Sequence, residues 1–344
     1  MHRYRVLQVL TWLFGAGLVV WTLTRLPLAT IQTSLSQVSL PQWMVWAGLN
    51  LAILVVYAQR WRCLLTAAGL QIDFRSVFLL RQAGQLISFI TPGPQFGGEP
   101  FQVYWLWKRF SASGAAAMLG VVLDRFYELW VNFAFLLLGL IVLMLTPALV
   151  LADWSSLAFS VALILFGLSC SGWFIVSHQG QLLVWIKKLG LRWQHSPLLG
   201  WVEGGWDELG TRMRMLIRAE KRSLAVALLL ALLGWGGMIF ETWLLLRFFA
   251  IETDFTALVL LLVGMRLAFL LPLPGGIGTL EAAVFWAFTA LGLPMAGAAA
   301  ILAMLRLRDA LILCVGLFAL HRLRHPFTSN APPIASKKWR IPDA

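Results

Sequence analysis

Long apolar stretches, separated by short polar segments, make up most of this chain of 344 residues. A helix needs about 20 apolar residues to cross the hydrocarbon core of a bilayer. The first stretch follows a short basic segment, but it is long for a signal peptide and is interpreted as a retained helix. In all, six stretches predict full membrane-spanning helices, at residues 6–26, 43–60, 114–147, 156–177, 223–247 and 296–320.

Two further apolar regions, residues 76–110 and 256–293, are interrupted by Pro and Gly. Backbone groups that such a break exposes are tolerated at membrane depth only where protein or a wet cavity satisfies them. Both regions are therefore interpreted as re-entrant helical hairpins, with eight or more shallow spans as the alternative. Because paired broken helices point to the binding site of transporters, the predicted site includes the hairpin backbone at Pro92, Gly93, Gly97, Gly98, Pro272, Pro274, Gly275, Gly276 and Gly278.

The order of these elements repeats along the chain, with two spans, a hairpin and a span in each half. The first half would start on the inner side of the membrane and the second half on the outer side. The predicted fold class is therefore an all-α polytopic membrane protein built as an inverted-topology repeat. The repeats are placed at residues 1–150 and 151–322, before a basic tail at 323–344. The two hairpins share the spacing of Gly84, Phe89, Pro92 and Pro94 with Gly264, Phe269, Pro272 and Pro274.

The composition excludes a soluble globular protein, because 60% of the residues are hydrophobic and only 12% are charged. The net charge of +12 would raise the question of nucleic acid in a soluble protein, but here the basic residues gather in the predicted loops. With a cytoplasmic N-terminus, 21 of the 27 Lys and Arg residues fall on the cytoplasmic side, as the positive-inside rule requires. This predicts a multi-pass protein of the cell inner (cytoplasmic) membrane, with both termini cytoplasmic and no nucleic-acid partner.

The longest polar segment, residues 178–222, combines eight basic residues with apolar residues at helical spacing. This pattern is typical of amphipathic helices that lie on an anionic membrane surface. A plain connector between the two halves is the alternative interpretation.

Ionisable residues inside membrane spans are costly and by default mark function. Asp124, Arg125 and Glu128 share one face of a predicted span and can pair locally. They form either a self-neutralised patch that stabilises the bundle or a polar wall of a substrate cavity.

The second half contains three further candidates, Arg266, Arg306 and Asp309. Arg306 and Asp309 lie three residues apart near the middle of the last predicted span. Arg266 has no neighbour in sequence that would neutralise it. It therefore needs an anionic ligand or a partner from another helix, for which Glu281 and Asp309 are candidates.

Glu99 and Glu281 follow the glycine-rich breaks, at the predicted start of the second limb of each hairpin. A carboxylate in the first turn of a helix is stabilised by the helix dipole and free N–H groups, so both residues are either capping acids or switchable counter-ions. The glycine N–H groups of the two breaks could also hold an anion such as phosphate. The cytoplasmic approach to the site is predicted to contain Arg60, Arg62, Arg81 and Gln85, although Arg60 and Arg62 could instead anchor the second span.

No residue pattern in the chain predicts catalysis or metal binding. The three cysteines are far apart, the five histidines form no ligand pair, and no Ser or Cys nucleophile is adjacent to a His. We therefore expect no catalytic residue, no metal, no cofactor and no enzymatic activity.

Several of these motifs together resemble the lysylphosphatidylglycerol synthase transmembrane-region family, also called the flippase-like domain family, which includes UPF0104-type integral membrane proteins. They are Arg60-Trp-Arg62, the segment from Gln85 to Glu99, Asp124-Arg125 and, most specifically, the segment from Pro272 to Ala283. The resemblance covers about residues 6–322. The chain departs from the family's first-hairpin pattern, Pro-Gly-Arg-x-Gly-Glu, by carrying Pro94 and Gln95 after Gly93.

The resemblance implies a lipid flippase-like transporter that moves a polar or phosphorylated lipid headgroup across the membrane. Membrane lipids with an anionic or isoprenoid-phosphate headgroup are the expected substrates. Synthase activity is not expected, because the sequence contains no soluble aminoacyl-transferase domain. The alternative is a membrane-embedded enzyme or an accessory scaffold of lipid or glycan biosynthesis, on isoprenoid-linked, hopanoid or glycolipid substrates. A cytoplasmic lipid-modifying enzyme and a second copy of the chain are candidate partners.

Overall fold

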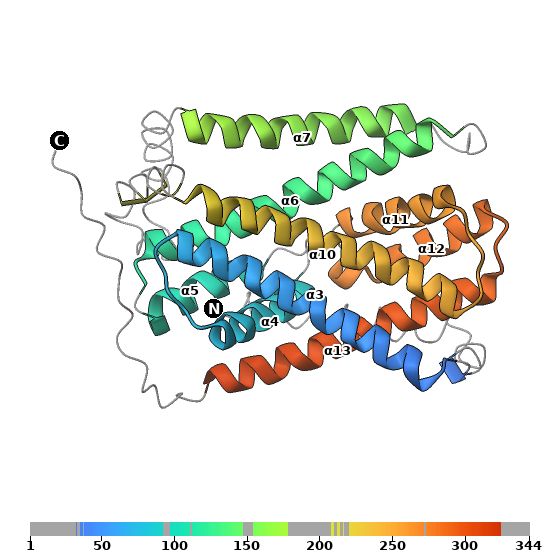
Figure 1. Cartoon of the computed structure of the whole chain (residues 1–344), viewed down its shortest axis with the longest axis horizontal. Coiled ribbons are helices and arrows are strands. Elements are labelled where there is room, and N and C mark those ends of the chain that lie inside the picture. The colour runs from blue at the N-terminus through green and yellow to red at the C-terminus, as the bar shows by residue number, and fades with distance from the viewer. Residues whose placement is uncertain are drawn as a thin grey trace, which may run out of the picture.

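The structure is a computed structural model, and every regular element in the part of the chain that it describes is helical. It describes residues 38–91, 97–110, 112–146, 154–177, 220–271 and 273–324, with residues 32, 35, 36, 208, 209, 212, 213 and 216. The elements are α3 (Leu40–Ala67), α4 (Phe74–Ile90), α5 (Gly98–Phe110), α6 (Gly114–Met144), α7 (Trp154–Ser177), α10 (Lys221–Phe248), α11 (Phe255–Leu270), the short 3-10 helix η3 (Pro274–Gly276), α12 (Thr279–Ala290) and α13 (Met295–Arg324) (Figure 1).

Four helices, α3, α6, α7 and α10, are long and apolar enough to cross a membrane. They confirm the spans predicted at 43–60, 114–147, 156–177 and 223–247. Helix α13 contains the span predicted at 296–320, but Arg306, Arg308 and Asp309 near its middle make it too polar to qualify by composition. The predicted first span lies outside the described residues, as do Pro92, Gly93, Pro272, most of 178–222 and the tail beyond residue 324.

The outer faces of the long helices are apolar, as lipid-facing surfaces must be. On α7, Phe159 and Phe166 are 70% and 66% exposed, and Leu229 on α10 is also exposed. Ionisable side chains in the middle of these helices, such as Asp124 on α6 and Glu241 on α10, are instead buried. The chain is thus a multi-pass helical membrane protein.

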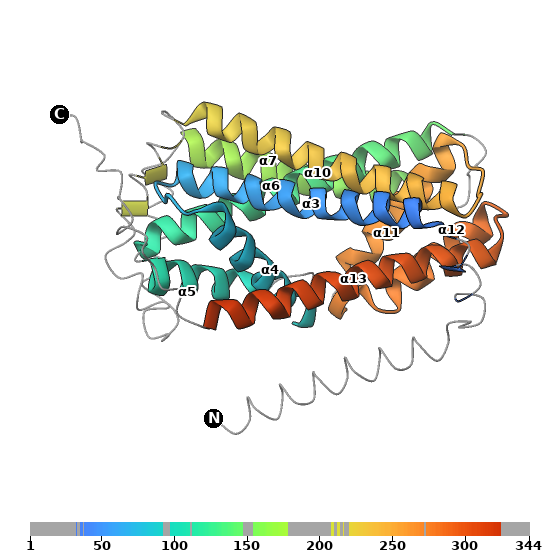
Figure 2. The ribbon, with the colours of Figure 1, turned by 60° about the horizontal axis from the view of Figure 1, so that its bottom comes forward.

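The two broken regions form two pairs of short helices, α4 with α5 and α11 with α12. Each pair begins with an aspartate that caps its first helix, because the Ser76 N–H donates to Asp73 at 2.9 Å and the Ala257 N–H donates to Asp254 at 2.8 Å. The pairs lie at opposite ends of the bundle (Figure 1). Figure 2 shows α4 and α11 entering the space between α3 and α13 from these two ends.

The tips of the two pairs meet inside the bundle. The end of α4 contacts η3, where a side chain on Gly275 would collide with the ring of Phe89. Gly275 has a φ of 58°, a left-handed conformation that favours glycine. Close packing at this point therefore depends on a residue without a side chain.

The helices of the two halves follow each other with one constant spacing. Helices α3, α4, α5 and α6 begin at residues 40, 74, 98 and 114, and α10, α11, α12 and α13 begin 181 residues later, at 221, 255, 279 and 295. The counterparts α3 and α10 pack side by side and run in opposite directions (Figures 1 and 2). The two sets also interlock, because α4 packs against α13 and α11 packs against α6.

Candidate functional site

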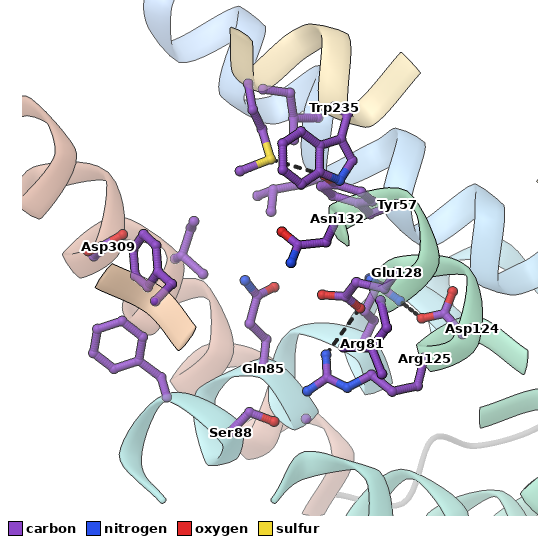
Figure 3. A pocket seen from close by; sticks show the side chains of 18 of the residues that line it. Tyr57, Arg81, Gln85, Ser88, Asp124, Arg125, Glu128, Asn132, Trp235 and Asp309 are labelled. Carbon is purple, nitrogen blue, oxygen red and sulfur yellow. Dashed lines mark hydrogen bonds and ion pairs between the residues drawn. The ribbon is translucent and has the colours of Figure 1, made fainter. Parts of the chain in front are cut away.

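A cavity of about 490 Å³ lies among the helices, lined from α3, α4, α5, α6, α10, α11 and α13. Its volume is in the range of cavities that hold a small molecule or a headgroup. Figure 3 shows polar side chains that project into it from several of these helices. Eight predicted site residues line the cavity: Arg81, Gln85, Glu99, Asp124, Arg125, Glu128, Arg266 and Asp309.

Asp124 is the centre of one buried ion-pair network. Its carboxylate accepts a hydrogen bond from Arg60 Nε at 2.8 Å and one from Arg81 Nη1 at 2.6 Å. Arg60 is only 1% exposed and also lies 3.6 Å from Glu128. Both guanidinium groups lie against the ring of Tyr57, with their central carbons 5.2 Å (Arg60) and 5.6 Å (Arg81) from the ring centroid. Arg60 therefore supports the cavity wall from behind and does not line the cavity itself.

Arg125 joins two carboxylates in the first half of the chain. Its Nη2 lies 2.8 Å from Glu99, and its Nη1 lies 3.2 Å from Glu128, as the spacing of three residues predicts. Glu99 also accepts the Gly97 N–H at 2.8 Å. The two alternatives for Glu99, a capping acid and a counter-ion for an arginine, are thus combined in one side chain.

Arg306 has the corresponding arrangement in the second half. Its Nε and Nη2 donate to the two oxygens of Glu281 at 2.7 and 2.9 Å, and its Nη1 donates to Asp309 at 3.1 Å. It also donates to the carbonyl oxygens of Gly275 and Gly276. Glu281 accepts the Gly278 N–H at 2.8 Å. Arg306 thereby satisfies carbonyl groups that the helix break exposes, and neither it nor Glu281 lines the cavity.

The two arrangements occupy equivalent places in the two sets of helices. Arg125 and Arg306 are 181 residues apart, and so are their acidic partners Glu128 and Asp309. This is the same spacing that separates the helix starts. The repeated feature is therefore an arginine on a long helix that holds the glutamate of the adjacent helix pair.

Glu241 is a buried site residue that the sequence pattern does not single out. It is 1% exposed, accepts hydrogen bonds from Trp46 and Asn50, and lies 2.7 Å from Arg308. It is the one acidic residue of the apolar helix α10, and the energetic cost of a charge inside a membrane span could have identified it as a candidate functional residue. A second signal was its place thirteen residues before Asp254, which matches the place of Arg60 before Asp73.

Arg266 differs from the other arginines of the site. The expected pairing with Glu281 or Asp309 is wrong, because Arg306 holds both of these carboxylates. Arg266 instead lies over the ring of Trp235, 4.2 Å from its centroid, with Nη2 3.2 Å from the sulfur of Met238. It forms no ion pair with any described residue. The physical reason is packing, since α10 brings an indole and a thioether to the place where a carboxylate was expected.

Besides Gly275, three described glycines of the breaks have positive φ angles, which favour glycine. The φ angles of Gly97, Gly276 and Gly278 are 151°, 61° and 84°. The N–H groups of the break glycines were considered as donors to an anion, but several are already used within the chain. Those of Gly97 and Gly278 bond to Glu99 and Glu281, and that of Gly98 bonds to Ser88.

Neutral polar groups complete the cavity. Gln85 and Asn132 project into it and make no hydrogen bond within the described part of the chain (Figure 3). Asn132 was not predicted, because a single amide in an apolar span has no distinctive spacing. Arg62, which was predicted, does not line the cavity. Among the described residues, no group of three or more His, Cys, Asp or Glu side chains is placed to hold a metal ion.

Comparison with known proteins identifies related membrane proteins. The profile of the family described as "Lysylphosphatidylglycerol synthase TM region" matches residues 8–316. A UPF0104 membrane protein of Methanothermobacter thermautotrophicus is 26% identical over 267 residues, which cover 74% of this chain and 77% of that protein. A UPF0104 membrane protein of Methanocaldococcus jannaschii is 23% identical over 271 residues, 76% of this chain and 78% of that protein. No solved structure matches the chain significantly.

Proposed function

The chain belongs to the lysylphosphatidylglycerol synthase transmembrane-region family, and we propose that it is a flippase-like transporter that carries a polar or phosphorylated lipid headgroup across the membrane. The observation that carries this proposal is the charged cavity among membrane-spanning helices. Ionisable groups at membrane depth are retained where they serve a substrate or ion pathway. A headgroup would occupy the cavity while its tails remain in lipid.

In this proposal the two helix pairs are re-entrant hairpins of an inverted-topology repeat. The constant spacing of 181 residues, the opposite directions of α3 and α10, and the meeting of the helix-pair tips at Phe89 and Gly275 support this interpretation. Transporters of this design move one repeat against the other around a site near the midplane. The pairs Glu99–Arg125 and Glu281–Arg306 would then open in alternation.

We place the protein in the cell inner membrane. The end of the bundle where α10 begins and α13 ends would face the cytoplasm. Basic residues gather there, with Lys221 and Arg222 on α10 and Arg322 and Arg324 on α13. This distribution supports cytoplasmic termini by the positive-inside rule. Transport without chemical change of the lipid is the activity we propose.

Leaflet exchange in proteoliposomes tests this function. The full chain would be reconstituted with lipids that carry a fluorescent group on one tail, so that the headgroup stays native. An impermeant reductant then reports which leaflet each lipid occupies. We expect exchange to be at least ten times faster than in protein-free liposomes. The exchange rate should fall in Arg266→Ala and remain in Arg247→Gln, whose arginine is exposed on the last turn of α10.

Two results would contradict the proposal. A lipid product of new mass, found without leaflet exchange, would indicate a membrane-embedded enzyme. Neither exchange nor a new product, combined with capture of a lipid-modifying enzyme, would indicate a scaffold. If exchange occurs but Arg266→Ala and Arg306→Ala leave it unchanged, the transport proposal stands and the site assignment is wrong.

A further inference from the structure

The charges around the cavity balance. Six arginines and six carboxylates either line it or belong to an ion-pair network that includes a lining residue, so the fully ionised site has no net charge. A site that already balances at membrane depth is disturbed least by a ligand whose own charges also balance. The twelve residues are Arg60, Arg81, Arg125, Arg266, Arg306 and Arg308, with Glu99, Asp124, Glu128, Glu241, Glu281 and Asp309.

The balancing charges are not all paired with one another. Five of the arginines hold the six carboxylates in two separate sets of ion pairs. In the first set Arg60, Arg81 and Arg125 balance Glu99, Asp124 and Glu128. In the second set Arg306 and Arg308 face Glu241, Glu281 and Asp309, so this set carries one excess negative charge. The sixth arginine, Arg266, carries the compensating positive charge without an ion-pair partner among the described residues. The cavity thus presents one guanidinium group that no carboxylate of the described residues neutralises through an ion pair.

The surroundings of the unpaired Arg266 are well defined. The guanidinium of Arg266 is held by neutral groups, the Trp235 ring at 4.2 Å and the Met238 sulfur at 3.2 Å. The Tyr57 hydroxyl donates to the same sulfur at 3.1 Å, which fixes its position. Neither contact neutralises the guanidinium, so its remaining N–H groups suit an anionic oxygen of a ligand.

The carboxylate best placed to meet a cationic group of a ligand is Glu128. Its side chain is 35% exposed, whereas those of Asp124, Glu241, Glu281 and Asp309 are at most 12% exposed and that of Glu99 is 23% exposed. Its Oε2 faces Arg125 and Arg60, but its Oε1 has no bonding partner in the described chain. Figure 3 shows Glu128 directed into the cavity near Gln85.

We infer that the cavity selects a zwitterionic lipid headgroup, with a phosphodiester at Arg266 and an ammonium group at Glu128. The inference rests on the proposed function, because it names the class of lipid that would be moved. A headgroup with only a phosphate would leave the cavity with a net negative charge and the Glu128 oxygen unused. An uncharged glycolipid would leave Arg266 unpaired.

Binding of short-chain lipids by the full-length protein in detergent tests the inference without measuring transport. The probes are dihexanoyl phosphatidylethanolamine (zwitterionic), dihexanoyl phosphatidylglycerol (anionic) and dihexanoylglycerol (uncharged), titrated by calorimetry. We expect the zwitterionic lipid to bind at least ten times more tightly than either of the others. Equal binding of the zwitterionic and anionic lipids to the unmodified chain would overturn the inference, whatever the variants do.

Two substitutions test the two ends of the headgroup separately. Arg266→Gln should weaken the zwitterionic lipid about tenfold and leave the uncharged lipid unchanged. Glu128→Gln should reverse the order and favour the anionic lipid, while Glu128→Asp, which keeps the charge, should preserve it. Arg247→Gln is the matched arginine control and should bind like the unmodified chain. An unchanged ratio of affinities in a folded Glu128→Gln would contradict the inference.

The binding experiment tests the headgroup selectivity and the leaflet-exchange experiment tests the transport function, and either can be contradicted without the other. If the zwitterionic lipid binds with the expected preference but no lipid changes leaflet, the selectivity stands and the proposed transport function is wrong. If lipids change leaflet at equal rates whatever their headgroup charge, transport stands and the zwitterionic selectivity is wrong.

Discussion

The guanidinium of Arg306 holds the carboxylate of Glu281 by two hydrogen bonds, from Nε at 2.7 Å and from Nη2 at 2.9 Å. The same arginine bonds to the carbonyl oxygens of Gly275 and Gly276. One side chain thus joins α13, the start of α12 and the break before it. Loss of this side chain should therefore destabilise the whole second helix pair, α11 with α12.

Arg306→Gln should strongly destabilise the fold. Removal of one partner from a buried ion pair costs about 3–5 kcal/mol, because the other charge remains buried without compensation. The substitution also deprives the two glycine carbonyl groups of their donor. Thermal unfolding in detergent, followed by tryptophan fluorescence, measures the loss. Arg247→Gln, at the exposed end of α10, should unfold at nearly the temperature of the unmodified chain.

Arg125→Gln, the equivalent change in the first half, should cost less. Glu99 is 23% exposed whereas Glu281 is 10% exposed, so water can partly solvate the carboxylate that Arg125→Gln leaves behind. We expect a loss of about 1–3 kcal/mol, in the range of coupled neighbours. An equal loss in the two variants would show that the different exposure of Glu99 and Glu281 does not set the cost.

The sequence predicts those features that depend on local spacing. The spans at α3, α6, α7 and α10 follow from apolar length, and the pairs Arg125–Glu128 and Arg306–Asp309 follow from helical geometry. Contacts between helices are not encoded in spacing. The pairing of Arg266 was therefore predicted wrongly, and Glu241 was missed although it pairs with Arg308. Both errors depend on which face α10 turns toward α11 and α13.

Gly275→Ala should destabilise the contact between the two helix-pair tips. A left-handed conformation costs a residue with a side chain about 1–2 kcal/mol. The new methyl group would in addition collide with the Phe89 ring, and overpacking costs about 1–3 kcal/mol more. The measurement is again thermal unfolding in detergent.

Gly292→Ala separates the two effects. Gly292 has a φ of 64°, close to that of Gly275, but no atom lies within 4 Å of the position that its side chain would take. The substitution therefore carries the conformational cost alone. Equal losses at Gly275 and Gly292 would mean that the tips of the two pairs are not in close contact in the folded protein.

Acid should weaken the contact between residue 208 and the start of α6. Burial opposes ionisation of Glu208, but hydrogen bonds from Ser113 at 2.7 Å and Arg212 at 2.6 Å outweigh this effect, so that its pKa lies below the ordinary value of 4.5. A lowered pKa stabilises the folded state above pH 4.5, and this stabilisation is lost as the pH falls through the lower, folded-state pKa.

Hydrogen exchange of residues 112–117 between pH 3 and pH 6, corrected for the intrinsic effect of pH, reports this contact. Protection should fall at the acid end of that range in the unmodified chain. Glu208→Gln should show low protection that does not change with pH. A fall of the same size in Glu208→Gln would assign the pH effect to another group.

Gln82→Met should stabilise the protein. Gln82 on α4 is only 1% exposed, and neither its amide nitrogen nor its amide oxygen has a hydrogen-bond partner among the residues that the structure describes. An unsatisfied buried polar group costs about 1–3 kcal/mol, and methionine has a similar length without that cost. Gln102→Met is the matched control, because Gln102 is partly exposed and lines the cavity, where its amide can be solvated. We therefore expect a higher unfolding temperature for Gln82→Met alone. A lower temperature would mean that the amide binds a buried water molecule or a polar ligand beside α4, and the polar site would then extend beyond the cavity.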